Sequence, residues 1–235
     1  MMKVANDRSP ARRRRAAAAL LPGLDQARPG AGRLLEAAVL AFAERGYHGV
    51  SVRDLTTAIG IQGASFYSHF ESKEELLFRI VLLVHERYAA ALREALLGAG
   101  AEPAAQLRAT IRAHVSMQAA HPYAAIVAST ELHALSPAHR ERILQMRQES
   151  VAMLSAIIER GNALGVFHCA KPWLAVSAIG AMGMRLAWWF RTPDQAGERG
   201  SLRAYAEAAK WFPGPPVTLE EVVDEYTEYA MRIVG

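Results

Sequence analysis

The sequence predicts an all-α protein, built from an N-terminal three-helix domain and a larger C-terminal helical domain. Apolar residues recur at helical spacing in most segments, no segment alternates like a half-buried strand, and glycines and prolines separate the helical runs. Of the 235 residues, 51% are hydrophobic and 21% are charged, which is typical of a globular protein with a real core.

A helix-turn-helix is predicted within residues 46–73. Ser51 is a good N-cap for its first helix, whose apolar face is formed by residues at helical spacing, namely Val52, Leu55, Ala58 and Ile59. Gly60 should end this helix, because only glycine adopts left-handed backbone cheaply, and Ile61 should fill the corner behind it. The second helix is expected over residues 63–70.

The second helix is expected to have a small, polar outer face. We expect Ala64, Phe66 and Phe70 to point inward, which leaves outside Gln62, Gly63, Ser65, Tyr67, Ser68 and His69. Small residues let a helix backbone approach base edges, and hydroxyl, amide and imidazole groups bind bases and phosphates. This pattern favours entry into a DNA groove over the alternative of a plain helical hairpin.

The next helix has a clear start. Ser72 is its expected N-cap, Glu74 and Glu75 suit the positive end of its dipole, and Lys73 should be free to reach a phosphate.

The helix over residues 33–45, followed by FAERGYHGVSVRDLTTAIGIQGASFYSHFESKEELL over residues 42–77, resembles the TetR family of transcriptional regulators. The resemblance implies that Ser51, Tyr67, His69 and Lys73 contact phosphates, and that Arg53 and residues 62–65 face the bases. The full set of expected DNA contacts is Arg33, Ser51, Val52, Arg53, Gln62, Gly63, Ala64, Ser65, Tyr67, Ser68, His69 and Lys73.

A homodimer on palindromic, double-stranded operator DNA is the expected assembly. A short recognition helix reads only a few base pairs, so specific affinity normally requires two copies. We expect the helices over residues 172–189 and 218–234 to form a four-helix bundle with their mates. A repressor is the expected form of regulator.

Three domains are expected: a basic, disordered arm over residues 1–30, the helix-turn-helix DNA-binding domain over 31–77, and a helical ligand-binding and dimerisation domain over 78–235. In the last of these, helical periodicity and its breaks predict helices over residues 73–97, 103–119, 123–135, 138–162, 172–189 and 218–234, the final one capped by Thr218. The proline-rich connection 191–217 should hold one short helix, at 201–210.

An apolar effector pocket is expected between the middle helices. Its candidate lining is Met117, Tyr123, Ile126, Met153, Met182, Trp188 and Trp189, with Arg147 and Arg185 as anion anchors. The alternative for each of these residues is ordinary core, and Trp188 and Trp189 are equally suited to a dimer interface.

The tail beginning Lys210-Trp211-Phe212-Pro213 resembles that of a TetR subgroup that regulates fatty-acid and sterol breakdown and responds to acyl-CoA. The resemblance implies a small hydrophobic effector of the acyl-CoA class. An unrelated hydrophobic or drug-like ligand is the alternative. The insertion between Trp188-Trp189-Phe190 and Trp211-Phe212 departs from the subgroup pattern.

The positive charge of the chain is concentrated at its start. Residues 1–33 hold eight lysines and arginines against two aspartates, so that the remaining chain is slightly negative although the whole has a net charge of +4. This arm either lies along DNA phosphates or is a solvated tail. Its apolar run is too short for an export signal.

Other functional classes receive little support from the sequence. Sequence motifs of hydrolases, nucleotide-binding enzymes and zinc proteases are absent, so an enzyme is not expected, and a helical adaptor would leave the polar recognition face unexplained. We expect no cofactor and no metal, since the eight histidines are scattered. The single cysteine, Cys169, and the lack of a long apolar run favour a cytoplasmic protein that does not cross a membrane.

Overall fold

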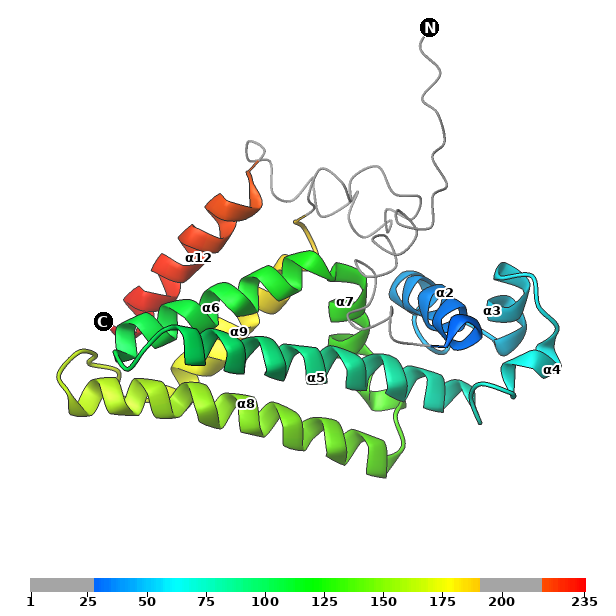
Figure 1. Ribbon diagram of the computed structural model, residues 1–235, viewed down its shortest axis with the longest axis horizontal. Helices are drawn as coiled ribbons and strands as arrows, with labels where there is room; N and C mark the ends of the chain where they lie inside the picture. The colour runs from blue at the N-terminus through cyan, green and yellow to red at the C-terminus, as the bar shows by residue number, and fades with distance from the viewer. Residues whose placement is uncertain (1–27, 191–216) are drawn as a thin grey trace, which may run out of the picture.

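The computed structural model describes residues 28–190 and 217–235, and every regular element in these ranges is helical (Figure 1). The all-α prediction is therefore confirmed. The predicted arm up to residue 27, the connection over 191–216 with its short helix, and the aromatic and proline-rich tail motif lie outside the described residues.

The described chain forms nine α-helices and one short 3-10 helix, η2. Their bounds are α2 Pro29–Arg45, α3 Val52–Ala58, α4 Gly63–Phe66, α5 Lys73–Gly98, α6 Pro103–Ala120, α7 Pro122–Thr130, η2 Leu132–Ala134, α8 Pro137–Ala163, α9 Pro172–Leu186 and α12 Leu219–Val234. Two predicted ends were wrong. The helix predicted over 123–135 stops at Thr130 and continues as η2, and the one predicted over 172–189 ends at Leu186, followed by a turn.

Local capping chemistry explains where the helices start. Ser51 forms a capping box with Asp54, and Ser72 accepts a hydrogen bond from the backbone N–H of Glu75. Thr218 forms a second capping box, with Glu221. Gly60 has a φ of 70°, and the N–H of Ile61 bonds back to the Thr56 carbonyl, so the chain reverses as the sequence predicted.

The recognition helix is shorter than predicted. Helix α4 has four residues and ends at Phe66, because residues 67–69 form a tight turn in which the N–H groups of His69 and Phe70 both bond to the Phe66 carbonyl. This turn returns Phe70 to the core beside Phe66 without further helix. Ala64, predicted to point inward, is exposed, as is Ala58 of α3.

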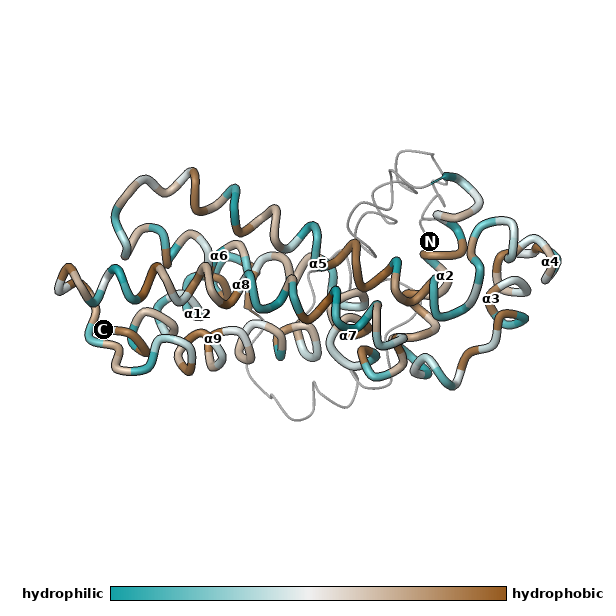
Figure 2. Tube along the Cα trace, turned by 90° about the horizontal axis from the view of Figure 1, so that it is seen from below, coloured by the Kyte–Doolittle hydropathy of each residue, from teal (hydrophilic) through white to brown (hydrophobic). Residues whose placement is uncertain are grey.

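The helix-turn-helix end and the C-terminal end are joined by two helices. Helix α5 runs the length of the molecule, and α7 lies between it and α2 (Figure 1). Hydrophobic and hydrophilic residues alternate along these helices, as expected for helices packed on one face (Figure 2).

Two hydrophobic cores hold the structure together. The first unites α2, α3 and α4 with α7 and the start of α5, around Phe42, Phe66, Leu77 and Ile126. The second lies among α6, α8, α9 and α12. Helix α7 therefore packs with the helix-turn-helix, although it begins only at Pro122, whereas α4 ends at Phe66.

Candidate functional site

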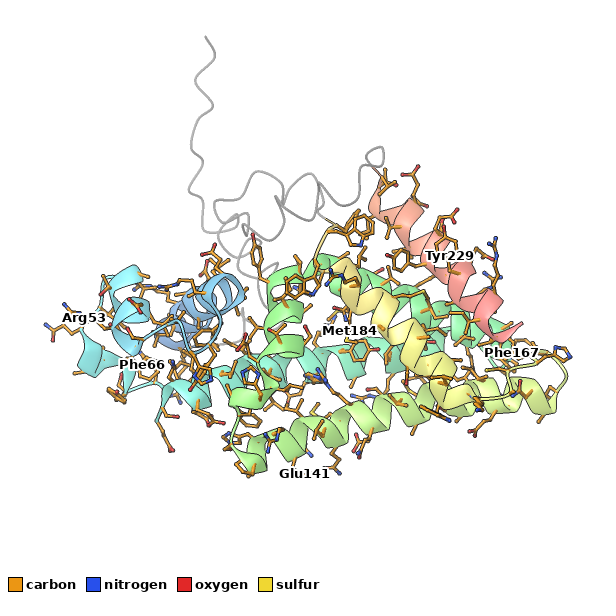
Figure 3. All side chains as sticks on the ribbon, turned by 180° about the vertical axis from the view of Figure 1, so that it is seen from behind. Arg53, Phe66, Glu141, Phe167, Met184 and Tyr229 are labelled. Atoms are coloured by element: carbon orange, nitrogen blue, oxygen red, sulfur yellow. The ribbon has the colours of Figure 1, made fainter. Side chains whose placement is uncertain are left out.

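The expected DNA contacts of α3, of α4 and of the turn after α4 lie together on one exposed end of the molecule. Arg53 projects outward there, while Phe66 of α4 points into the core (Figure 3). Tyr67 is 62% exposed, and the other exposed members of the set are Gln62, Gly63, Ala64, Ser65, Ser68 and His69. Val52 is half-buried. The arrangement presents small and hydrogen-bonding groups on a surface that a DNA groove could meet.

Lys73 corrects one expectation, because its ammonium is not free. It donates hydrogen bonds to the carbonyls of Tyr47 (2.9 Å) and Val50 (2.6 Å), and it lies 4.0 Å from the centre of the Tyr47 ring. Burial lowers the pKa of Lys73. The side chain therefore ties the loop before α3 to the start of α5, and only the third N–H donor of its ammonium remains for a phosphate.

Three other predicted contacts also build the domain. The Ser51 hydroxyl donates to the Asp54 carboxylate at 2.7 Å, and this hydrogen bond lowers the pKa of Asp54. The Arg33 guanidinium donates to the Ile59 carbonyl, which anchors the end of α3 to α2. The His69 ring lies so close to Gly30 that a Cβ there would be 2.4 Å from its Nε2.

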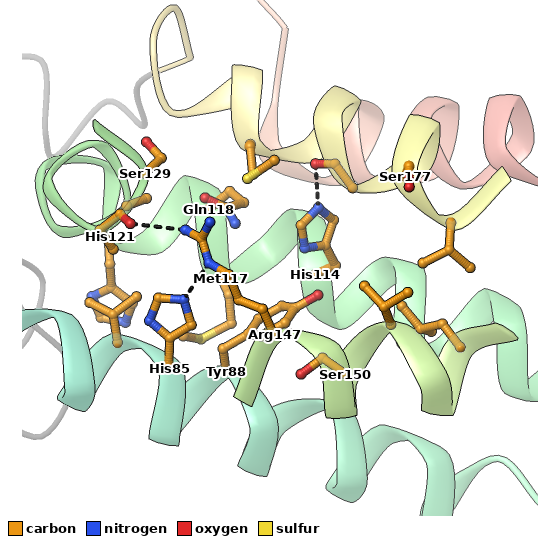
Figure 4. Close-up of a pocket in the computed structure, with 18 residues that line it drawn as sticks. His85, Tyr88, His114, Met117, Gln118, His121, Ser129, Arg147, Ser150 and Ser177 are labelled. Carbon is orange, nitrogen blue, oxygen red and sulfur yellow. Dashed lines mark hydrogen bonds between the residues drawn. The ribbon is translucent and has the colours of Figure 1, made fainter. Parts of the chain in front are cut away.

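A pocket of about 320 Å³ lies among α5, α6, α7, α8 and α9 (Figure 4). Apolar side chains make much of its wall, and its polar groups come from different helices. The lining residues are Val84, His85, Tyr88, His114, Met117, Gln118, His121, Ala125, Ala128, Ser129, Arg147, Ser150, Val151, Leu154, Val176, Ser177, Gly180 and Met184. An apolar lining with a few convergent polar groups is typical of a small-molecule binding site.

Arg147 is the only permanently charged residue in this described lining, which contains no carboxylate. Its Nε donates to Nε2 of His85 at 3.0 Å, and its Nη2 donates to the Ala128 carbonyl at 3.0 Å. Because Nε2 of His85 accepts a hydrogen bond, the ring proton is on Nδ1, which donates to the Val81 carbonyl at 2.8 Å. Burial and then the Arg147 charge lower the pKa of His85 to about 4.

Two of the nine predicted pocket residues, Met117 and Arg147, line the cavity. The other seven do not. Tyr123 and Ile126 are buried in the first core, Trp188 packs against that core, and Met182 and Trp189 pack against the second. Met153 is half-buried outside the lining, and Arg185 is exposed, 5.6 Å from the Trp188 ring.

Sequence reasoning missed most of the polar lining. His85 and Tyr88 interrupt the apolar face of α5, and His114 does the same on α6. Polar residues on the buried face of an amphipathic helix are the signal that could have located the pocket.

Other kinds of site find no support in the described residues. Among residues 28–190 and 217–235, no group of three or more His, Cys, Asp or Glu side chains is placed to hold a metal ion. Nor is any helix in those ranges long and apolar enough to cross a membrane.

An exposed helix-turn-helix at one end and a largely apolar pocket behind it define a ligand-responsive DNA-binding regulator. Residues 34–80 match the family model described as "Bacterial regulatory proteins, tetR family", and residues 100–198 match "Tetracyclin repressor-like, C-terminal domain". The chain belongs to the TetR family of transcriptional regulators, which bind operator DNA as dimers.

Three relatives illustrate the similarity. The transcriptional repressor KstR2 of Rhodococcus jostii is 26% identical over 196 residues, covering 82% of this chain and 85% of that protein. The crystal structure of the TetR-family regulator PfmR from Thermus thermophilus is 32% identical, with a TM-score of 0.68 over 85% of this chain and 97% of that one. AibR, solved with isovaleryl coenzyme A and operator DNA, shares the fold at 20% identity, with a TM-score of 0.68 over 84% and 96% of the two chains.

Gly63 provides a test of the DNA-facing surface. A Cβ at Gly63 would meet nothing within 4 Å, so Gly63→Ala should fold as stably as the wild type. On DNA, the added methyl group at the first residue of α4 should hold the backbone away from the base edges, and we expect about a tenfold loss of operator affinity, or about 1.4 kcal/mol. Fluorescence anisotropy on an operator selected from random DNA measures the affinity, and thermal unfolding measures the stability.

Gly98→Ala is the matched control, because a Cβ there also meets nothing within 4 Å and Gly98 ends α5, away from the helix-turn-helix. It should change neither quantity. Equal operator affinity of Gly63→Ala and the wild type would contradict the assigned surface.

His85 predicts a pH dependence of stability. Its pKa is lowered from 6.5 to about 4 in the folded protein, so the unfolded chain binds the proton more readily. The stabilisation is complete above pH 6.5 and is lost as the pH falls toward 4, by roughly 2 kcal/mol at pH 5. His85→Gln, which keeps an acceptor for Arg147 but does not titrate, should lose about that much less stability between pH 7.5 and pH 5.

Urea unfolding at the two pH values measures this difference. The surface variant His168→Gln should behave like the wild type, because His168 is exposed. An unchanged pH dependence in His85→Gln would mean that His85 is not held neutral by its surroundings.

Proposed function

We propose that this chain is a repressor that a small hydrophobic effector with an anionic or strongly polar head, such as an acyl-CoA, releases from palindromic operator DNA. The observation that supports this most is the position of Arg147. It is the lone fixed charge of a largely apolar pocket, and it also touches the helix that packs against the DNA-binding domain. An effector oxygen that accepted a hydrogen bond from this guanidinium would compete with the two acceptors it already has, His85 Nε2 and the Ala128 carbonyl.

Arg147 donates to the Ala128 carbonyl, for which helix α7 has no hydrogen-bond donor of its own. Ala128 lies in the last turn of α7, where carbonyls have no partner within the helix and the dipole is negative. The guanidinium thus acts as a C-terminal cap on α7 from inside the pocket. An effector that draws it away leaves this end of α7 uncapped.

The same end of α7 also contacts the DNA-binding domain. Glu131, which directly follows the helix, accepts a hydrogen bond from the backbone N–H of Tyr47 at 3.2 Å, and the Tyr47 carbonyl accepts one from Lys73. A ligand in the pocket therefore changes the equilibrium between two orientations of the helix-turn-helix domain, provided that it binds one orientation more tightly than the other.

The acyl-CoA class is supported by the relatives. AibR was solved with isovaleryl coenzyme A, and the chain matches the repressor KstR2 over most of its length. A pocket of about 320 Å³ is at the small end for ligand sites, so we expect the acyl group to enter it and the nucleotide to stay outside.

We further propose that α9 lies at the centre of the dimer interface. It exposes Trp173, Leu174 and Met184 by 61%, 49% and 40%. Helix α12, which the sequence paired with α9, exposes Tyr229 and Ile233 by 44% and 39%, and two of its exposed carboxylates are already neutralised by the ion pairs Arg108–Glu228 and Arg112–Asp224 with α6. We therefore keep the expected four-helix bundle, in which α9 and α12 pack against the same helices of the partner subunit.

We keep the division at residues 31–77 and 78–235 as a proposed domain boundary, with α7 packed on the first domain. The expected DNA contacts likewise remain proposals. Operator DNA in bacteria is cytoplasmic, and we place the protein there; we propose no catalytic role.

Arg147→Met tests the effector site. It removes the cation but keeps an unbranched apolar side chain, so we expect octanoyl-CoA to bind at least about tenfold more weakly and to lose its effect on operator binding. Tryptophan fluorescence measures effector binding, and anisotropy measures release from the operator.

The matched control is Arg185→Met, the other predicted anion anchor, which is exposed outside the pocket. It should respond like the wild type. If Arg147→Met is released as readily as the wild type, the effector does not bind at this guanidinium. If acyl-CoAs of every chain length leave wild-type binding unchanged, the acyl-CoA class is wrong and an unrelated hydrophobic ligand takes its place.

A further inference from the structure

His114 presents a buried nitrogen that has no hydrogen-bond partner. The residue is 5% exposed and lines the pocket from α6. Its Nε2 lies 3.2 Å from the Gly180 carbonyl on α9, while Nδ1 is buried without a partner among the described residues. Since a carbonyl can only accept, Nε2 carries the proton and Nδ1 is left as an acceptor.

The fold makes room for this ring. A Cβ at Gly183 of α9 would lie 2.0 Å from Nε2 of His114, so only glycine allows the imidazole to sit against that helix. The ring also meets Tyr88 of α5 edge to face, with 5.5 Å between ring centres. Three helices therefore fix the ring in one orientation, and Figure 4 shows it among the side chains that line the pocket.

An acceptor held in this way is costly unless something donates to it. A buried polar atom without a partner loses its hydrogen bonds to water on folding and gains none in return. Burial lowers the pKa of His114 to about 4, so the ring does not remove the problem by taking up a second proton at neutral pH. Nδ1 thus requires an O–H or N–H group that residues 28–190 and 217–235 do not supply.

A single water in a neighbouring void is the competing partner. A void of about 20 Å³ adjoins His114, large enough for one water. Its lining is mostly apolar, and the Thr110 hydroxyl there already bonds to the carbonyls of Gln106 and Leu107, both at 2.9 Å. A buried water usually needs two to four polar partners, and the polar side chains in the described lining of this void are His114, Thr110 and Tyr88. The main pocket has more polar lining groups than the void, which favours a donor from the main pocket.

We propose that the effector carries a hydroxyl or N–H donor on its apolar part, which bonds to Nδ1 of His114 while its polar head binds Arg147. This inference rests on the proposed effector site and narrows its ligand to a hydroxylated acyl group in place of a plain saturated one. The Tyr88 hydroxyl also belongs to the lining and can donate to the same ligand oxygen. His114 is then the residue that sets effector specificity.

The test compares octanoyl-CoA with hydroxyoctanoyl-CoAs that carry the hydroxyl at each chain position from carbon 3 to carbon 8. Binding to the full chain is measured by tryptophan fluorescence. We expect at least one hydroxylated probe to bind the wild type about tenfold more tightly than octanoyl-CoA. In His114→Phe, which keeps a ring of similar size, the preference should fall below about twofold.

Two further variants separate specificity from folding. Tyr88→Phe removes one hydroxyl and keeps the ring, and it should reduce the preference for the same probe. His168→Phe makes the same change as His114→Phe at an exposed site and should keep the wild-type preference. The ¹⁵N shift of Nδ1 in wild-type His114 should change when the preferred probe saturates the protein.

The inference is wrong if octanoyl-CoA binds the wild type as tightly as every hydroxylated probe does, or if the preference for a hydroxylated probe survives in His114→Phe. It is also wrong if the preferred probe leaves the ¹⁵N shift of His114 Nδ1 unchanged, because a water would then already occupy that acceptor. Failure of the proposed function looks different, because then neither octanoyl-CoA nor any hydroxylated probe binds the wild type, and the inference fails with it.

Discussion

The Arg147 guanidinium joins three helices at the pocket. It projects from α8, hydrogen bonds to His85 on α5, and caps α7 at Ala128. Arg147 is half-buried, and a cation partly withdrawn from water without a carboxylate partner is costly; here two acceptors compensate for part of that cost, one of them a histidine that must stay neutral. The pocket is thus held open around a charge that a ligand anion could satisfy better.

Helix α7 connects Arg147 to the DNA-binding domain, because it contacts both. Its apolar residues belong to the core of the DNA-binding domain, while Ala125, Ala128 and Ser129 line the effector pocket. The hydrogen bond from Tyr47 to Glu131 joins its end to the loop before α3. One short helix therefore belongs both to the pocket wall and to the core of the DNA-binding domain.

The helix-turn-helix was predictable because its signals are local. Ser51, Gly60 and Ser72 each act on the few residues beside them, so the helix-turn-helix could be placed from the sequence. Lys73 was misjudged because its partners, Tyr47 and Val50, lie more than twenty residues away and meet it only after folding. The length of α4 depended in the same way on how Phe66 and Phe70 share a core.

The sequence predicted that an apolar pocket lies between the middle helices, but it did not predict most of the residues that line the pocket. Apolar periodicity says that Tyr123 and Ile126 are buried, but the packing of α7 on α2 decides that they face the first core and not the cavity. His85 and His114 were visible as polar residues on buried faces, yet their roles depend on Arg147 and on the space at Gly183, both distant in the sequence.

The central claim is that a ligand in the pocket changes the distance between the two helix-turn-helix domains of the dimer by displacing Arg147 from Ala128. Electron spin distance measurements on the dimer test it most directly, with a label at Glu71→Cys, an exposed position between α4 and α5, in a Cys169→Ser background. The account predicts that octanoyl-CoA shifts the distance between the two labels and that Arg147→Met abolishes the shift. An unchanged distance in a wild-type dimer that octanoyl-CoA has released from its operator would contradict it.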